Sequence, residues 1–295
     1  MLQPDDPRQE LLNAIALLPG HSSAEREAIN VWLKALPAPL MGQWPDMALA
    51  ASVTLDQKRL TLRAAGATLR MAQSTRAFLS LAGGAPSELA ALDEALATLD
   101  PVVLGSWLEI GPQGVDGGWF LPSPMHLKDV LGLLPPSDAL DALLQWAAER
   151  GIDHCLGLRR SVNAAAPYTD LTLPLPDGMA HEQLAATLIL FETLGAQTLP
   201  EPLRRAILRE LEAPLAVSAW LLPEGLAQLS VLIHDPSEAL RTAAATACGT
   251  NAEGIRPFVH ACGPGQVPMA LEIQRTADGL QAELHLEVRE AEPPN

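Results

Sequence analysis

Positive charge is scarce in this sequence. The 295 residues include 19 Lys and Arg against 35 Asp and Glu, which gives a formal net charge of −16. Nucleic acids and anionic membrane surfaces are bound through basic side chains, so neither is an expected partner of this chain. We expect the partner to be a small molecule, and the sequence leaves the oligomeric state open.

Cysteines and long apolar runs are also scarce. The three cysteines, Cys155, Cys248 and Cys262, are widely spaced and form no CxxC pair, which predicts free thiols rather than disulfides or a zinc site. No apolar run reaches the roughly 18 to 20 residues of a membrane helix. The first ten residues, MLQPDDPRQE, lack the basic start and apolar core of a signal peptide. The expected location is cytoplasmic.

Several short motifs of well-known chemistry are missing. The sequence contains no GxSxG, no Walker A loop, no GxGxxG after a strand and no DDxxD-type metal motif. A hydrolase nucleophile elbow, a phosphate-binding loop and a dinucleotide site are therefore not indicated. No residue is assigned as a metal ligand, and Mg²⁺ is the one cofactor left open.

What the sequence does contain is a repeated pattern of helix followed by hairpin. Hydrophobic residues make up 48% and charged residues 18%, a composition typical of a folded chain. The strand pairs are predicted at residues 47–55 and 59–63, 102–110 and 118–121, 155–160 and 168–175, 215–222 and 227–234, and 269–275 and 280–289. The helical segments are predicted at residues 9–18 and 24–36, 71–99, 128–150, 181–194 and 201–211, and 237–247. The repeat recurs about every 55 residues and uses the whole chain.

Five hairpins supply about ten antiparallel strands, and an open sheet of that size tends to curl or split. Closing the sheet into a ring removes the exposed strand edges. We therefore predict an α+β fold in which repeated ααββ units form a closed antiparallel barrel surrounded by helices. Residues 1–295 are expected to form this single domain.

Side chains alternate along the predicted strands between an apolar and a polar face. In the last strand Leu280, Leu284 and Leu286 share one face, and the other face carries Gln281, Glu283, His285, Glu287 and Arg289. Two readings of the polar faces are open. They either face water, as in a one-sided antiparallel sheet, or line the interior of the barrel, where a small molecule could bind.

Aromatic residues are few, at 4% of the chain, yet some of them lie in phase with the polar faces. Trp107, Tyr168 and Trp220 alternate in this way, and Trp220 lies two residues from Ser218. Rings placed among polar groups suit an amphipathic ligand. This pattern favours a binding site inside the barrel.

The order helix, helix, strand, strand resembles that of the ABBA-fold aromatic prenyltransferases, whose barrel is also called the PT barrel. The resemblance covers nearly the whole chain and is best from Gly117 to Asp235, which includes GGWFLPSP and AWLLPEGLAQLSVLIHDP. It implies a ten-strand barrel ringed by helices. It also implies an enzyme that transfers a prenyl group from an allylic diphosphate to an aromatic or indole-like acceptor of secondary metabolism.

The chemistry implied by this resemblance directs attention to three groups of residues. A leaving diphosphate needs converging cations and phenol donors, an allylic cation needs aromatic walls, and the acceptor needs a proton-handling group. The candidates for the diphosphate are Arg59, Arg63, Arg159, Tyr168 and Arg289. The candidates for substrate contact are Trp107, Trp119, Trp220, Gln228 and His234, and those for catalysis are Glu272, Glu283 and His285.

Two other functions are left open by the residues. The polar face of the last hairpin is mainly acidic, and the strands LAVSAWLL and LAQLSVLI contain no Lys or Arg. A cyclase or isomerase that uses Glu and His on the same barrel is one alternative, and a small-molecule-binding protein is another. Convergence of the arginines inside the barrel is the feature that favours a prenyltransferase.

Overall fold

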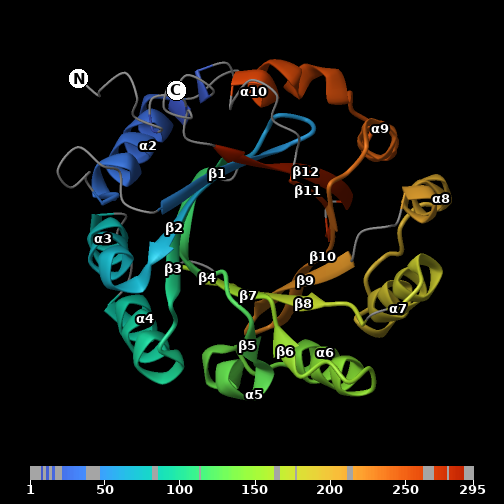
Figure 1. The fold of residues 1–295 in the computed structure, drawn as a ribbon, viewed down its shortest axis with the longest axis horizontal. Coiled ribbons are helices and arrows are strands. Elements are labelled where there is room, and N and C mark those ends of the chain that lie inside the picture. The colour runs from blue at the N-terminus through green and yellow to red at the C-terminus, as the bar shows by residue number, and fades with distance from the viewer. Residues whose placement is uncertain are drawn as a thin grey trace, which may run out of the picture.

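The computed structural model describes residues 8, 11–12, 15–16, 22–37, 47–81, 86–112, 114–162, 167–176, 178–210, 215–261, 269–277 and 279–288. Within them, ten strands form a closed antiparallel barrel (Figure 1). Its strands are β1 (Met47–Thr54), β2 (Leu60–Ala67), β3 (Val103–Gly111), β4 (Gly114–Leu121), β7 (Gly157–Ser161), β8 (Thr169–Pro174), β9 (Leu215–Leu222), β10 (Gly225–His234), β11 (Ala270–Thr276) and β12 (Gly279–Val288).

The ring closes where the first strand meets the last. β1 pairs with β12 on one side and with β2 on the other, and the remaining neighbours follow the order of the chain. This arrangement confirms the predicted antiparallel barrel built from five hairpins. Because each of the ten described barrel strands has two neighbours, the barrel itself presents no open strand edge.

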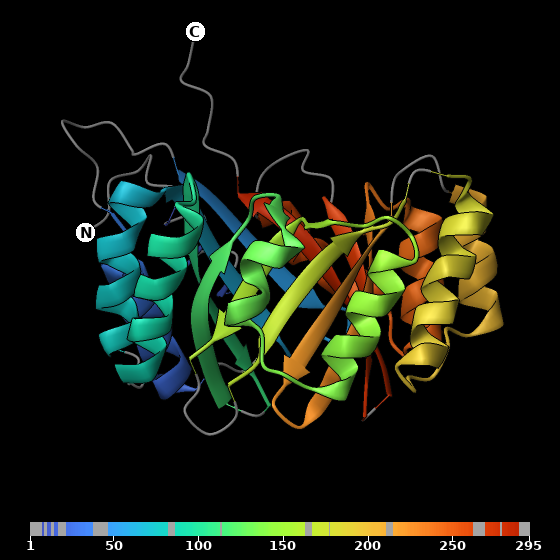
Figure 2. The same ribbon diagram turned by 90° about the horizontal axis from the view of Figure 1, so that it is seen from below.

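Helices surround the barrel on its outside, and Figure 2 shows them beside the tilted strands. They are α2 (Ser23–Ala35), α3 (Thr68–Leu81), α4 (Pro86–Leu99), α5 (Leu127–Val130), α6 (Asp138–Ala148), α7 (Ala180–Thr193), α8 (Glu201–Glu210), α9 (Glu238–Ala247) and α10 (Arg256–Ala261), with 3₁₀ turns η1 (Leu131–Leu133) and η2 (Ala252–Ile255). Two short strands, β5 (Met125–His126) and β6 (His154–Cys155), pair outside the barrel. The sequence pattern did not predict these short strands or the 3₁₀ turns.

Local sequence signals fix where several helices begin. Ser22 accepts a hydrogen bond from the backbone N–H of Glu25, and the Glu25 carboxylate accepts one from the backbone N–H of Ser22. This capping box satisfies two backbone groups that the first turn of α2 cannot pair internally. Ser137 and Ser237 cap α6 and α9 in the same position, each accepting from a leucine N–H three residues later. The helix starts are thus encoded locally.

The outer face of the barrel packs against the helices through apolar side chains. Val53, Leu62, Leu171 and Leu284 are fully buried there and belong to one large core. Burying such a side chain contributes about 1.5–3 kcal/mol each to folding. The alternation seen in the sequence therefore sends the apolar face outward, towards the helices, and the polar face towards the barrel interior.

Other sequence predictions concern segments outside the barrel strands. The predicted first helix, residues 9–18, lies mostly outside the described residues, although Leu11 and Ile15 are buried. Cys155 and Cys248 are free thiols, as predicted, and Cys262 lies outside the described residues. No helix within the described ranges has the length and apolar character needed to span a membrane.

Candidate functional site

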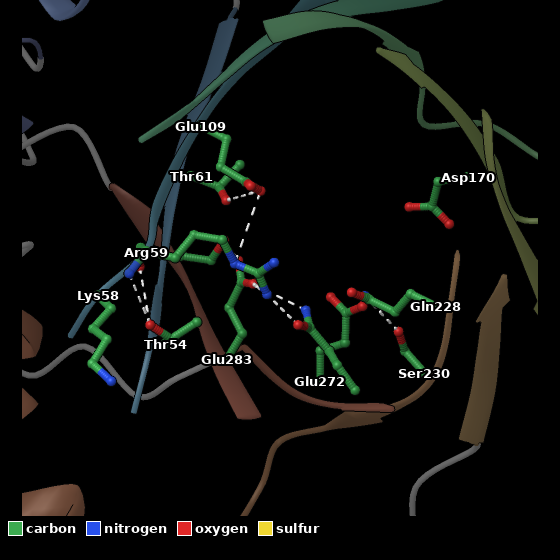
Figure 3. A network of polar contacts seen from close by, with 12 residues as sticks. Thr54, Lys58, Arg59, Thr61, Glu109, Asp170, Gln228, Ser230, Glu272 and Glu283 are labelled. Atoms are coloured by element: carbon green, nitrogen blue, oxygen red, sulfur yellow. Dashed lines mark hydrogen bonds and ion pairs between the residues drawn. The ribbon is translucent and has the colours of Figure 1, made fainter. Parts of the chain in front are cut away.

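The interior of the barrel is lined by polar and aromatic side chains contributed by many strands. Strand register places Arg63 opposite Trp107, and Asp170 opposite both Arg159 and Trp220. In Figure 3, Arg59, Glu109, Asp170, Glu272 and Glu283 project inward from different walls. Most of these side chains are at least nine-tenths buried, and so the polar faces line the interior instead of facing water.

An aromatic cluster, formed by Trp107, Tyr168 and Trp220, lies on the interior side and is separate from the core under the helices. The rings of Tyr168 and Trp220 are stacked, with their centroids 4.4 Å apart and an interplanar angle of 3°. Trp107 lies 6.1 Å from Tyr168, tilted by 40°. Phe120 packs against the cluster, and its ring occupies the space that a side chain at Gly105 would need.

Arg159 lies within this aromatic cluster. Its guanidinium carbon is 4.7 Å from the ring centroid of Trp220, 5.1 Å from that of Trp107 and 6.0 Å from that of Tyr168. Its Nη2 is 3.0 Å from Oδ2 of Asp170. A buried guanidinium needs such partners, because desolvation alone is strongly unfavourable. Burial by itself would lower the pKa of Arg159, but the charges of Asp170 and the other interior carboxylates outweigh it and raise the pKa, so Arg159 stays a cation.

Three hydrogen-bond donors of this region are unused. Among the described residues, no partner exists for Nε of Arg159, the hydroxyl of Tyr168 or Nε1 of Trp220. All three side chains are more than 90% buried. Burial raises the pKa of Tyr168 well above its usual value, so its hydroxyl keeps its proton and can donate. Unsatisfied buried donors are costly, and their grouping here is typical of a site that binds an acceptor-rich ligand.

Arg59 connects the aromatic cluster to a second group of polar side chains. Its guanidinium carbon is 5.8 Å from the Trp220 ring, and its Nη2 is 3.2 Å from Oε2 of Glu283. It also donates to Gln274, and its Nε lies 4.0 Å from Glu109. Burial would lower the pKa of Arg59, but the charge of Glu283 raises it. Arg59 is therefore engaged by carboxylates on two sides.

Arg63, His285 and Glu272 form a chain of hydrogen bonds. Nη1 of Arg63 lies 2.9 Å from Oγ of Ser52 and 3.2 Å from Nδ1 of His285, and Nε2 of His285 lies 3.1 Å from Oε2 of Glu272. A guanidinium can only donate, so Nδ1 of His285 is an acceptor in this contact. The other ring nitrogen, Nε2, is then the donor to Glu272.

Arg63 is the least compensated of the interior arginines. In the described part of the chain its one ion pair is with Glu283, at 4.0 Å. Burial lowers the pKa of Arg63, and the like charge of Arg159 lowers it further. An anion placed between Arg63 and Arg159 would relieve this repulsion.

Glu272 and Glu283 lie directly opposite each other on β11 and β12. Burial would raise the pKa of both, yet both are lowered: that of Glu272 by the hydrogen bond from His285, and that of Glu283 by the charge of Arg59. Both are therefore ionised at neutral pH. Ser52, Arg59 and Gln274 donate to Glu283, whereas Oε1 of Glu272 has no partner among the described residues.

Three interior carboxylates, Glu109, Asp116 and Asp170, were not singled out from the sequence. Glu109 and Asp116 lie opposite each other on β3 and β4, and burial raises the pKa of each. Thr61 donates to Glu109, and Ser161 donates to Asp116. The alternation from Trp107 to Glu109, two residues further along the same strand, was the signal that could have identified Glu109.

Most of the predicted site residues converge inside the barrel. Those brought together are Arg59, Arg63, Arg159, Tyr168, Trp107, Trp220, Gln228, Glu272, Glu283 and His285. Gln228 is buried and donates to Ser230, whose hydroxyl donates to Glu272. This convergence is the feature that the sequence analysis named as favouring a prenyltransferase.

Three predicted residues do not join this group. Trp119 lies opposite Ser106, and Ser106 accepts a hydrogen bond from Trp32 of α2, so Trp119 faces the helices and its predicted interior position is corrected. Phe120, one residue later, has the interior position instead. His234 is exposed at the end of β10. Arg289 lies outside the described residues.

The carboxylates of the interior do not gather into a metal-binding set. Within the described ranges, no three or more His, Cys, Asp or Glu side chains are arranged to hold a metal ion. The acidic groups are instead divided among arginines, hydroxyls and His285. We therefore assign no residue to Mg²⁺.

Comparison with known structures identifies the same barrel in other proteins. The chain is similar to 6-dimethylallyltryptophan synthase of Micromonospora olivasterospora, solved with DMASPP and Trp, with a TM-score of 0.69, 17% identity and 99% and 100% of the two chains covered. It is also similar to AnaPT of Neosartorya fischeri, with a TM-score of 0.63, 11% identity and 96% and 92% coverage. At these identities the likeness establishes the ABBA, or PT-barrel, fold.

Sequence comparison gives one further relative. A PH domain-containing protein of Dictyostelium discoideum is 26% identical over 276 residues, which cover 88% of this chain. The matched region spans 60% of that protein's length. No protein-family model matches the chain.

Proposed function

We propose that the barrel binds an allylic diphosphate together with an aromatic or indole-like acceptor and transfers the prenyl group to the acceptor ring. One observation carries this proposal. Arg159 is surrounded by the aromatic cluster, and the unused donors of Arg159, Tyr168 and Trp220 are buried beside the rings. An anionic leaving group and a carbocation need such donors and such rings in one place.

The diphosphate is proposed to bind between Arg63 and Arg159, with Tyr168 as a third donor. In the described part of the chain the one ion pair of Arg63 is a 4.0 Å contact with Glu283, and burial and the charge of Arg159 both lower its pKa, so an anion between the two arginines stabilises both. Arg59 is held by Glu283 and has a supporting role. Charge-assisted hydrogen bonds to an oxyanion are about twice as strong as neutral ones.

The reaction requires a proton acceptor after bond formation. The allylic C–O bond breaks, its electron pair leaves with the diphosphate, a ring carbon of the acceptor forms the new C–C bond, and the ring then loses a proton. Glu109 is suited to take this proton, because burial raises its pKa and makes it a stronger base. Glu272 and Glu283, whose pKa values are lowered, are suited to remain charged and to stabilise positive charge.

The proposal is tested by calorimetric titration of the purified chain with dimethylallyl diphosphate and geranyl diphosphate. Binding is expected for at least one of them, and Arg159→Gln should weaken it by about 10-fold or more, the cost of a lost charge-assisted contact. Arg76→Gln is the matched control, since Arg76 lies on the outer surface and pairs with Asp93. It should leave the affinity unchanged.

Turnover is tested by incubating the protein with the bound diphosphate and indole-bearing acceptors, and by detecting the prenylated ring by mass spectrometry. Glu109→Gln should lower the rate by about 100-fold or more while leaving diphosphate affinity nearly unchanged. If neither diphosphate gives heat or a thermal shift, the prenyltransferase proposal fails. Equal binding by the Arg159 variant would remove the proposed diphosphate site.

A further inference from the structure

Carboxylates outnumber guanidinium groups inside the barrel. Among the described residues, five carboxylates face three guanidinium groups. The carboxylates are Glu109, Asp116, Asp170, Glu272 and Glu283, and the guanidinium groups are those of Arg59, Arg63 and Arg159. Nδ1 of His285 accepts from Arg63, and Nε2 contacts Glu272. A buried excess of negative charge is unfavourable unless protons or a ligand compensate it. Burial raises the pKa of Glu109, Asp116 and Asp170, which favours their neutral forms, whereas Glu272 and Glu283, whose pKa values are lowered, stay ionised.

One of these carboxylates has a free oxygen. Oε2 of Glu272 is 3.1 Å from Nε2 of His285, and Ser230 also donates to the carboxylate. Oε1 has no partner among the described residues, although the side chain is only 5% exposed. Figure 3 shows Glu272 projecting into the barrel interior next to Gln228 and Ser230. An ionised carboxylate oxygen left without a donor in this setting indicates a ligand group that donates to it.

The three interior arginines contact groups other than Glu272. Arg59 contacts Glu283 at 3.2 Å, Arg159 contacts Asp170 at 3.0 Å, and Arg63 donates to Ser52 and His285. None of the ion pairs within the described ranges joins an arginine or lysine to Glu272, whose one ion-pair contact is with His285. The ionised Glu272 is thus without an arginine or lysine partner in the described part of the chain, and a cationic group of the acceptor would supply one.

We infer that the acceptor bound in this barrel carries a protonated amine, which pairs with the free oxygen of Glu272. This inference rests on the proposed function, because it describes the acceptor of that reaction. An ammonium group satisfies both observations at once, since it donates to Oε1 and adds one positive charge to the interior. A neutral N–H satisfies only the first, and a carboxylate on the ligand satisfies neither.

The test uses three ligands with the same indole ring and side chains of different charge. Tryptamine, tryptophol and indole-3-propionate are titrated separately into the full chain at about pH 7.5, where an alkylamine is protonated. Tryptamine should bind about 10-fold or more tightly than tryptophol, because hydrogen bonds between charged groups are stronger. Indole-3-propionate should bind most weakly of the three.

A pair of variants locates the effect. Glu272→Gln keeps the shape of the side chain and an oxygen for His285, and it should bring the affinity for tryptamine down to that for tryptophol. Glu94→Gln removes the same charge from the exposed surface of α4 and should leave the preference unchanged. If the Glu272 variant does not fold, the order of the affinities of the three ligands for the unmodified chain still tests the inference.

The inference is overturned if tryptophol or indole-3-propionate binds as tightly as tryptamine, if Glu272→Gln retains the preference, or if none of the three binds. No diphosphate is present in these titrations, so they are independent of the test of transfer. Tryptamine binding without diphosphate binding would keep the amine site and reject the prenyltransferase. Diphosphate binding with no preference for tryptamine would reject the amine site and leave the prenyltransferase proposal standing.

Discussion

The outer and inner faces of the barrel are both buried, but two neighbouring arginines on β7, one on each face, differ in how many hydrogen-bond partners they have. Arg160 faces the helices, where Nε and Nη2 contact Glu88 of α4 at 2.7 and 3.3 Å and Nη1 donates to the carbonyl of Leu133 at 3.1 Å. Its neighbour Arg159 faces the interior and leaves Nε without a partner in the described part of the chain. Two adjacent arginines thus differ in their hydrogen bonding: the contacts of Arg160 tie the barrel to the helices, whereas Nε of Arg159 is left for the proposed ligand.

The same contrast separates two tryptophans. Trp32 of α2 donates through Nε1 to Ser106 on the outer face of β3, at 3.2 Å. Trp220 is also buried, at 9% exposed, but its Nε1 has no partner among the described residues. Burial alone therefore does not distinguish the candidate site from the core. For these two tryptophans the difference lies in the hydrogen bond of Nε1, which is made by Trp32 and not by Trp220. The outer face also contains an exception, since Nε1 of Trp119 has no partner among the described residues.

The largest expected effect comes from breaking the outer ion pair. Arg160→Leu leaves the nearly buried Glu88 without its cation and should cost about 3 kcal/mol of unfolding free energy, measured by urea denaturation. Arg159→Leu should cost less, about 1 kcal/mol, because burial already raises the pKa of Asp170 and a proton can replace the lost cation. The double variant with Glu88→Leu should recover most of the loss at Arg160. Equal costs at the two arginines would contradict the comparison.

The second prediction concerns Gly118 on β4, which packs closely against β7 and against Trp107 of the aromatic cluster. A methyl group at Gly118 would overlap the carbonyl oxygen of Arg160 and lie 2.7 Å from Nε1 of Trp107. Gly118→Ala should therefore cost about 2 kcal/mol of unfolding free energy. Gly111→Ala is the control, since its nearest neighbour would be the flexible side chain of Arg59 at 3.5 Å, and it should cost less than about 0.5 kcal/mol. A silent Gly118 variant would show that β4 can shift.

The third prediction compares the two tryptophans by the same substitution. Trp32→Phe removes a buried hydrogen bond and leaves Ser106 unpaired, so it should cost about 1 kcal/mol more than Trp220→Phe in thermal or urea unfolding. Trp220→Phe removes a donor that has no partner, and its effect should be seen mainly as weaker diphosphate binding. If Trp220→Phe is the more destabilising of the two, its indole N–H is part of the folded structure's own network.

The smallest effect is expected in the dependence of stability on pH. Burial raises the pKa of Glu109 and Asp170, so the folded protein binds these protons more tightly than the unfolded chain. Their contribution to the unfolding free energy therefore rises as the pH falls from the pKa of each group in the folded protein to its pKa in the unfolded chain, about 4. The stability contributed by Glu272 and Glu283 depends on pH in the opposite direction, because the pKa of each is lower in the folded protein. It is fully present above about pH 4.3, the value in the unfolded chain, and is lost as the pH falls further.

Urea denaturation at a series of pH values tests this balance. The unfolding free energy should increase by about 0.5–1 kcal/mol between about pH 7 and pH 5, and Glu109→Gln should reduce that increase. Glu94→Gln, on the exposed surface of α4, should leave it unchanged. An unaltered slope in the Glu109 variant would mean that its carboxylate has an ordinary pKa in the folded protein.

Much of this architecture was determined by the sequence alone. Period-two alternation, helix caps and turn residues are local signals, and together they predicted five hairpins, the surrounding helices and the closure of the sheet. Alternation also assigned most interior residues to one face, because a strand sends successive side chains to opposite sides. The same alternation places Glu109 on the interior face with Trp107, but the sequence analysis did not extend the pattern to Glu109 and so missed this residue of the candidate site.

Only the tertiary structure decided which atoms meet. The register between strands far apart in the chain places Arg59 against Glu283 and Arg63 against His285, more than 200 residues later. At GGWF, where two adjacent aromatic residues compete, packing against Ser106 and the helices turned Trp119 outward, so Phe120 is the interior ring. Such choices depend on long-range packing and pairing free energies that no short stretch of sequence contains.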